Sequence, residues 1–118
     1  MPEAISIDEF KKVELKVARI LSVEDIPGKD RLYLLKIDVG EEQPRTIFAG
    51  IKEFYSKEQL QGKSIIVVAN LQARRLGSIE SQGMLLAAKA VDGSFSLLMP
   101  KANASAGEKA FLIGSIAQ

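Results

Sequence analysis

Two adjacent arginines, Arg74 and Arg75, stand between two apolar stretches, and their chemistry suits them to binding an anionic ligand. A guanidinium group presents a planar fork of donors that pairs bidentately with phosphate oxygens. The short polar residues that follow, Ser81 and Gln82, can hydrogen-bond sugars and base edges. The order of these groups along residues 69–88 therefore points to a nucleic-acid contact surface.

The charge of the chain is unevenly distributed, although its sum is only +1. Residues 1–59 hold ten Lys or Arg against twelve Asp or Glu, whereas residues 60–118 hold six against three. Because nucleic-acid affinity comes largely from neutralised phosphates, we expect a local basic face and modest, salt-sensitive binding. Scattered, solvated charges are the alternative interpretation.

Histidine and cysteine are both absent from the 118 residues. Histidine is the commonest general base and metal ligand, and no carboxylate pair stands out, so we expect neither an enzyme nor a metal or cofactor site. The lack of cysteine excludes disulfides and favours a cytoplasmic location. No apolar run reaches the roughly 20 residues of a membrane span, and the N-terminus has no secretory segment, so we expect no membrane partner.

The polar residues need a scaffold, and the apolar period of the sequence indicates β-structure within one domain over residues 1–118. We predict a first strand from Val13, which slips by one residue at Val17 and Ala18, as a β-bulge would make it. Further strands are predicted over 32–39, 45–51, 64–71 (buried on both faces), 84–91 and 95–99, with turns at 27–30 and at Asp92-Gly93.

Two short helices are also expected, because Ser6 with Glu9 and Ser56 with Gln59 both have the spacing of a capping box. The second helix falls between the third and fourth strands. A bulged first strand and a helix in that place predict an all-β protein. Its expected form is an OB-fold, a five-stranded Greek-key barrel, with short appended helices and strands. Barrels of this size host unrelated functions, so the fold alone assigns none.

Four blocks of sequence carry a family resemblance. They are DEFKKVELKVARI (8–20), RLYLLKIDVG (31–40), FAGI (48–51), and NLQARR followed by ESQGMLLAA (70–88). In this order they resemble the tRNA-binding domain at the C-terminus of bacterial and archaeal methionyl-tRNA synthetases. The same domain is found in freestanding dimeric tRNA-binding proteins and in the cytokine-precursor cofactor of eukaryotic synthetase complexes. The resemblance covers about residues 6–109.

The resemblance implies an OB-fold, a homodimer, and recognition of tRNA by shape rather than by anticodon. The positions that match the family's nucleic-acid surface are Arg31, Asn70, Arg74, Arg75, Ser81, Gln82 and Met84. Arg31 stands where the family usually has lysine. Two departures occur: Ala73 replaces a proline, and Gly77-Ser78 replaces a basic residue and a glycine, which removes one positive charge.

Plainer interpretations exist for several of these residues. Ser81 and Gln82 have side chains that commonly satisfy the backbone of a tight turn, and Met84 suits simple core filling. Tyr33 and Phe48 are the aromatic residues to consider as base-stacking platforms. Tyr33 shares a strand face with apolar residues, so we expect it in the core or in a dimer interface.

We therefore expect a non-catalytic, structure-specific tRNA-binding module that raises tRNA affinity as a homodimer. It is either freestanding or cut from a methionyl-tRNA synthetase, whose catalytic region would then be a further partner. Two weak sites on one dimer bind a structured RNA more tightly than one site does. The dimer interface is expected at residues 110–116 and around Phe54 and Tyr55. The alternative is a secretion-chaperone-like dimer that binds peptides, while a general single-strand binder needs a row of exposed aromatics.

Overall fold

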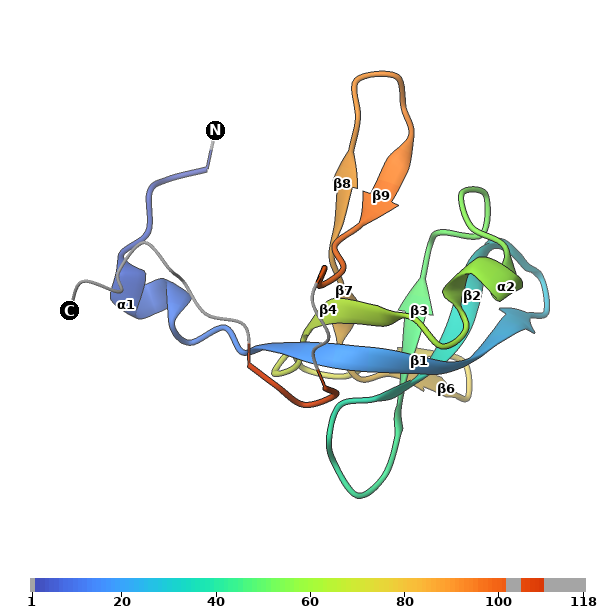
Figure 1. Cartoon of the computed structure of the whole chain (residues 1–118), viewed down its shortest axis with the longest axis horizontal. Helices are drawn as coiled ribbons and strands as arrows, with labels where there is room; N and C mark the ends of the chain where they lie inside the picture. Colours follow the sequence, from blue (N-terminus) through green and yellow to red (C-terminus); the bar gives the residue numbers. More distant parts are fainter. Residues whose placement is uncertain (1, 102–104, 110–118) are drawn as a thin grey trace.

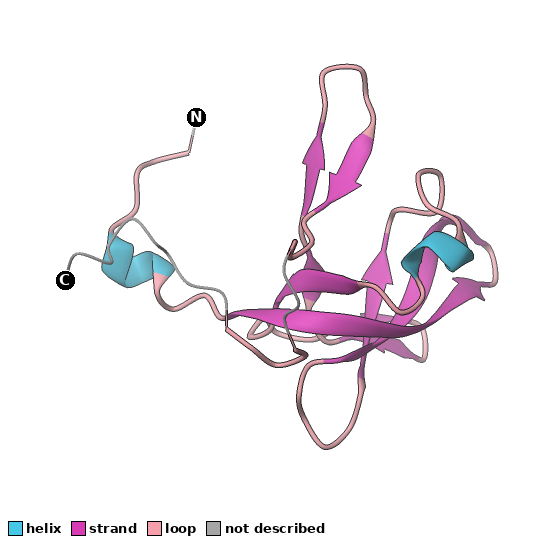
Figure 2. Cartoon of the chain, in the orientation of Figure 1, coloured by secondary structure: helices cyan, strands magenta, loops and turns pink. Residues whose placement is uncertain are grey.

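The computed structural model describes residues 2–101 and 105–109, and strands form most of its regular structure (Figure 2). In chain order the elements are α1 (Ile7–Phe10), β1 (Leu15–Ile26), β2 (Lys29–Asp38), β3 (Arg45–Ala49), α2 (Lys57–Leu60), β4 (Ser64–Val68), β5 (Arg74–Leu76), β6 (Ile79–Ser81), β7 (Met84–Leu85), β8 (Ala87–Lys89) and β9 (Phe95–Leu97). The all-β class and the helix between the third and fourth strands, both predicted from sequence, are confirmed.

Strand β1 lies at the centre of a five-stranded antiparallel sheet of order β3-β2-β1-β4-β7 (Figure 1). Its first part pairs with β4 from Leu15 to Arg19, and its second part pairs with β2 from Arg19 to Ile26. The two parts share Arg19, and a register shift between Ile20 and Ser22 follows within the pairing with β2. A bulge is therefore present as predicted, but it lies about three residues later than the expected slip at Val17 and Ala18, where the pairing with β4 is regular. The bent strand serves two sides of the structure.

The edge of this sheet at β3 is hydrogen-bonded to the segment that leads into β7. The backbone N–H of Gln82 donates to the Thr46 carbonyl at 2.8 Å, and the Thr46 hydroxyl donates to the Glu80 carbonyl at 2.6 Å. Because strand β7 also pairs with β4, these bonds close the sheet on itself. Closure satisfies the edge groups of β3 that an open sheet would expose.

The core lies inside this closed sheet. The residues Tyr33, Leu35, Ile37 and Val39 all face inward from β2 and the residue after it, as their period of two predicts. Helix α2 has the predicted capping box between Ser56 and Gln59 and inserts the fully buried Leu60. Tyr33 is buried in this core, and its hydroxyl donates to the Tyr55 carbonyl at 2.8 Å.

Strand boundaries after β4 differ from the sequence prediction. Residues 84–91 form two strands rather than one, because β7 pairs with β4 whereas β8 leaves the barrel and pairs with β9. The predicted hairpin turn at Asp92-Gly93 is present but is longer than two residues, since residues 90–94 connect β8 to β9. Strands β5 and β6 were not predicted.

Two smaller expectations also need correction. Residues of β4 are not equally buried on both faces: Ile65 and Val67 are buried, while Ile66 and Val68 are half-buried.

At α1, the Ser6 hydroxyl accepts from the Glu9 N–H at 3.1 Å as predicted. The Glu9 carboxylate pairs with Lys12 instead of returning to Ser6, so only half of that capping box forms.

Helix α1 and the β8–β9 hairpin extend away from the barrel (Figure 1). Phe54 packs against Phe95 of β9 with ring centroids 4.5 Å apart.

The expected dimer segment 110–116 lies outside the described residues. Within the described residues, none of the helices has the length and apolar character needed to cross a bilayer.

Candidate nucleic-acid interface

The arginine pair lies on a short hairpin formed by β5 and β6. Arg74 is opposite Ser81, and Arg75 is opposite Glu80. The hairpin turns at Gly77, whose φ of +64° is readily adopted only by glycine. Gly77, a departure from the family pattern, therefore permits a tight turn that holds both arginines on an antiparallel pair.

Both guanidinium groups are exposed and available. Over residues 2–101 and 105–109, the ion pairs all involve other cations, so neither Arg74 nor Arg75 is neutralised by a carboxylate. An unpaired guanidinium keeps its donors for an incoming anion and has no ion pair to break.

Ser81 holds the hairpin to the barrel. Its side chain is buried, at 3% exposure, and its hydroxyl accepts from the Phe48 N–H at 3.0 Å. The same hydroxyl donates to the Gly83 carbonyl at 3.2 Å. The structure therefore gives Ser81 an internal role, as the plainer interpretation anticipated, and its contact with RNA stays a prediction.

Gln82 and Asn70 also bind the protein's own backbone. The Gln82 side-chain oxygen accepts from the Thr46 N–H at 3.1 Å. The Asn70 oxygen accepts from the Glu14 N–H at 2.8 Å, and its amide group donates to the Lys12 carbonyl. These two residues fix the segment before and after the hairpin, so they position the arginines from both ends.

Arg45, which the sequence analysis did not select, ties these ends together. One of its nitrogens donates to the Ala69 carbonyl at 2.6 Å and to the Gln82 carbonyl at 3.1 Å. Its other donors bond the Glu41 carboxylate at 2.6 and 2.8 Å, and this hydrogen bonding holds the pKa of Glu41 below its ordinary value. Nothing in the local pattern around Arg45 signals bonds to carbonyls so far along the chain.

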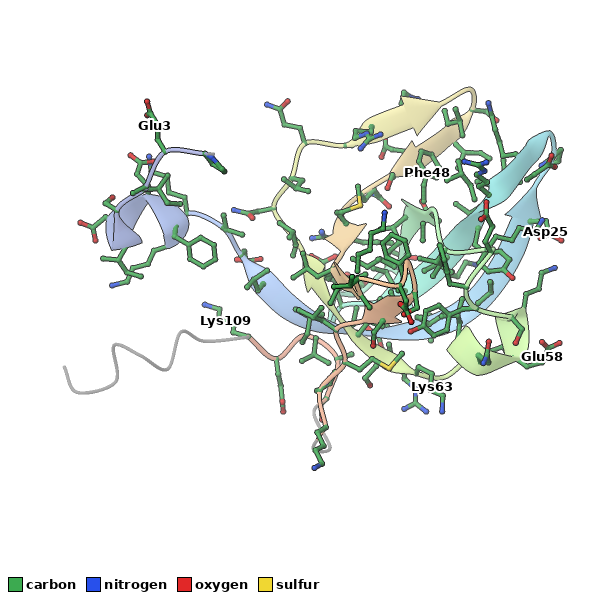
Figure 3. The ribbon with its side chains drawn as sticks, turned by 90° about the horizontal axis from the view of Figure 1, so that it is seen from above. Glu3, Asp25, Phe48, Glu58, Lys63 and Lys109 are labelled. Atoms are coloured by element: carbon green, nitrogen blue, oxygen red, sulfur yellow. The ribbon has the colours of Figure 1, made fainter. Side chains whose placement is uncertain are left out.

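Two hollows flank the hairpin. The smaller, of about 220 Å³, we call the Phe48 hollow; it is lined by Leu32, Phe48, Gly50, Arg74, Arg75, Leu76, Ser81 and Met84. The larger, of about 490 Å³, is lined by residues 71–74 and by Ser81, Gly83 and Met84. Figure 3, seen from above, shows Phe48 beside the pale yellow hairpin. Four of the seven candidates, Arg74, Arg75, Ser81 and Met84, thus meet at one place.

Arg31 is not brought to this place. It pairs with Glu53 at 2.9 Å, with both side chains largely exposed, and it lines neither of the two hollows. Its neighbour Leu32 faces the opposite side of β2 and does line the Phe48 hollow. Arg31 therefore lies apart from the arginine pair on the surface, and its contact with RNA stays a separate prediction.

Comparison with known proteins places these features in context. Residues 15–109 match the family model described as "Putative tRNA binding domain". The chain is 44% identical over 108 residues to a methionine–tRNA ligase of Thermococcus kodakarensis, covering 91% of this chain and 14% of the ligase. It is 50% identical over 105 residues to the ligase of Caldanaerobacter subterraneus, covering 89% of this chain and 16% of that protein. The chain thus spans about one seventh of these relatives.

Solved structures show the same architecture. A MetRS-related protein from Pyrococcus horikoshii superposes with a TM-score of 0.84 at 34% identity, covering 93% of this chain and all of that one. The CsaA chaperone protein from Picrophilus torridus superposes with a TM-score of 0.82 at 29% identity, covering 92% of this chain and all of that one.

Proposed function

Because this chain belongs to the tRNA-binding domain family, we propose that it binds folded tRNA through the β5–β6 hairpin. The single observation that carries the proposal is the position of Arg74 and Arg75 beside the Phe48 hollow. Both side chains are exposed, and among the described residues neither forms an ion pair with a carboxylate. Phosphate contacts of this kind carry no base sequence directly, so tRNA shape would be recognised. The matched family is a binding domain rather than a catalytic one.

The setting of the module is a further part of the proposal. In a methionyl-tRNA synthetase the domain would raise the affinity of the catalytic region for tRNA by supplying a second contact on the same molecule. As a freestanding protein it would bring tRNA to other partners. In either setting we propose that it works in the cytoplasm, where tRNA is charged.

We also propose that the functional form is a homodimer. One domain offers few cations, and two symmetry-related hairpins would contact one structured RNA at two places. Phe54 is exposed and is suited to such an interface. Sedimentation at micromolar concentration should therefore show a species of twice the 12.8 kDa chain mass. A single species of the chain mass under those conditions would contradict the dimer.

Peptide binding is the second candidate, favoured by the close superposition with CsaA chaperone proteins. The two functions predict opposite retention of the same protein. We expect immobilised tRNA to retain the chain and to release it as salt is raised, because the contacts are ionic. A column of unfolded peptide should retain little. Stronger, salt-insensitive retention by peptide would favour the chaperone-like function instead.

A further inference from the structure

We propose that the Phe48 hollow binds a single unpaired nucleobase, whose flanking phosphates contact Arg74 and Arg75. The inference rests on the proposed tRNA binding and goes beyond it, because shape recognition through phosphates alone requires no base to enter the protein. The proposal depends on three properties of the hollow: its aromatic wall, its size and the charge at its rim.

The aromatic wall is held in place by the barrel. Phe48 lies on β3 with its neighbours Ile47 and Ala49 buried, so its own ring points outward and is half-buried. Its backbone N–H is bonded to the buried Ser81 hydroxyl, and its Cα partner on β2 is Leu34. A ring on such a rigid strand offers a preformed face on which a base stacks.

The other walls are apolar, and the space is small. Leu32, Leu76 and Met84 are half-buried around the hollow. Its volume of about 220 Å³ is below the roughly 300–1,000 Å³ of pockets that hold drug-sized ligands. The hollow therefore suits one flat ring system and not a run of stacked bases.

The charge at the rim selects a nucleotide over an apolar peptide side chain. Arg74 and Arg75 line the same hollow as Phe48, and no ion pair holds either guanidinium among the described residues. Glu80, opposite Arg75 on the hairpin, is the nearby carboxylate along the strand pair. A nucleotide joins a flat aromatic ring, whose faces stack on apolar surface, to an anion, which matches an apolar hollow with two cations at its edge.

The chain offers two independent ways to disable the hollow. Phe48→Leu keeps an apolar side chain but removes the π face. Gly50→Leu would place an apolar side chain in the wall of the hollow, and the position accepts it, because a Cβ at Gly50 would meet only Leu32 Cδ2, at an ordinary 3.8 Å. Phe10→Leu is the matched control, since Phe10 belongs to α1, which extends away from the barrel (Figure 1).

The probe is a pair of short RNA duplexes with the same base pairs, one fully paired and one that differs only by a single extra, bulged 2-aminopurine in one strand. We expect the bulged duplex to bind the full chain at least about fivefold more tightly, since stacking of one base on an aromatic ring is a sizeable gain. The 2-aminopurine fluorescence should fall as the complex forms, because stacking quenches it. Phe48→Leu and Gly50→Leu should abolish the preference and the quench, while Phe10→Leu keeps both.

Binding of intact tRNA, measured in parallel, separates this inference from the proposed function. Equal affinity for the two duplexes, with tRNA still bound, would overturn the base pocket and leave tRNA binding standing. A preference and quench that survive in both hollow variants would overturn it as well. If tRNA itself fails to bind, the proposed function fails and the inference with it.

Discussion

Replacement of both Arg74 and Arg75 by alanine is expected to weaken tRNA binding by at least about tenfold, because in the proposed complex each guanidinium would form charge-assisted bonds to phosphate. The loss should be similar for tRNAs of different sequence, since phosphate contacts carry no base information directly. A plot of log affinity against log salt concentration should become flatter by up to about two units, one for each phosphate no longer neutralised.

The matched control for this experiment is the Lys63→Ala, Lys89→Ala double variant, which removes the same net charge from exposed positions outside the Phe48 hollow. It should change the affinity and the salt slope much less than the arginine variant does. If both double variants behave alike, net charge and not the hairpin governs binding. If the arginine variant binds as the natural chain does, the basic face lies elsewhere, for example around Arg31 and Lys36.

Ser81→Ala is expected to lower the free energy of unfolding by about 1–3 kcal/mol, because the Phe48 N–H would lose its partner in a half-buried place. The variant should also weaken tRNA binding, since the bond joins the arginine-bearing hairpin to β3. Urea unfolding followed by circular dichroism measures the first effect, and tRNA titration below the unfolding transition measures the second.

Ser78→Ala serves as the control, because Ser78 is exposed in the turn of the same hairpin. A surface change of this kind should alter stability by less than about 0.5 kcal/mol. Unchanged stability of Ser81→Ala would contradict the anchoring role. Full stability with weakened tRNA binding would instead assign the Ser81 hydroxyl to the RNA.

The sequence was sufficient to predict the barrel where its signals are local or periodic. Alternation marks the inward residues Tyr33, Leu35 and Ile37, and the Ser56–Gln59 spacing marks α2. Each of these signals depends on neighbours a few residues away. The family resemblance also predicted the kind of domain, which the matched family model confirms, whereas the role of the arginine pair in binding stays a prediction.

The sequence was insufficient where distant segments meet. Strands β5 and β6 have three residues each, too few for a period of two to be recognisable. The Ser81 hydroxyl bonds a backbone group 33 positions away, and Arg45 bonds carbonyls 24 and 37 positions away. Such bonds follow from how the barrel closes. Ser81, Gln82 and Asn70, whose polar side chains suggest ligand contacts in the sequence, prove to bond the protein's own backbone in the structure.

Competition between folded tRNA and unstructured RNA of the same length, at one fixed salt concentration, tests the central claim most directly. Both RNAs carry the same number of phosphates, so a purely ionic surface would bind them alike. Because a folded RNA holds its phosphates at fixed spacing, we predict that tRNAs with different anticodons bind within a few-fold of one another and distinctly better than the unstructured strand. Equal or tighter binding of the unstructured strand would contradict recognition of folded tRNA.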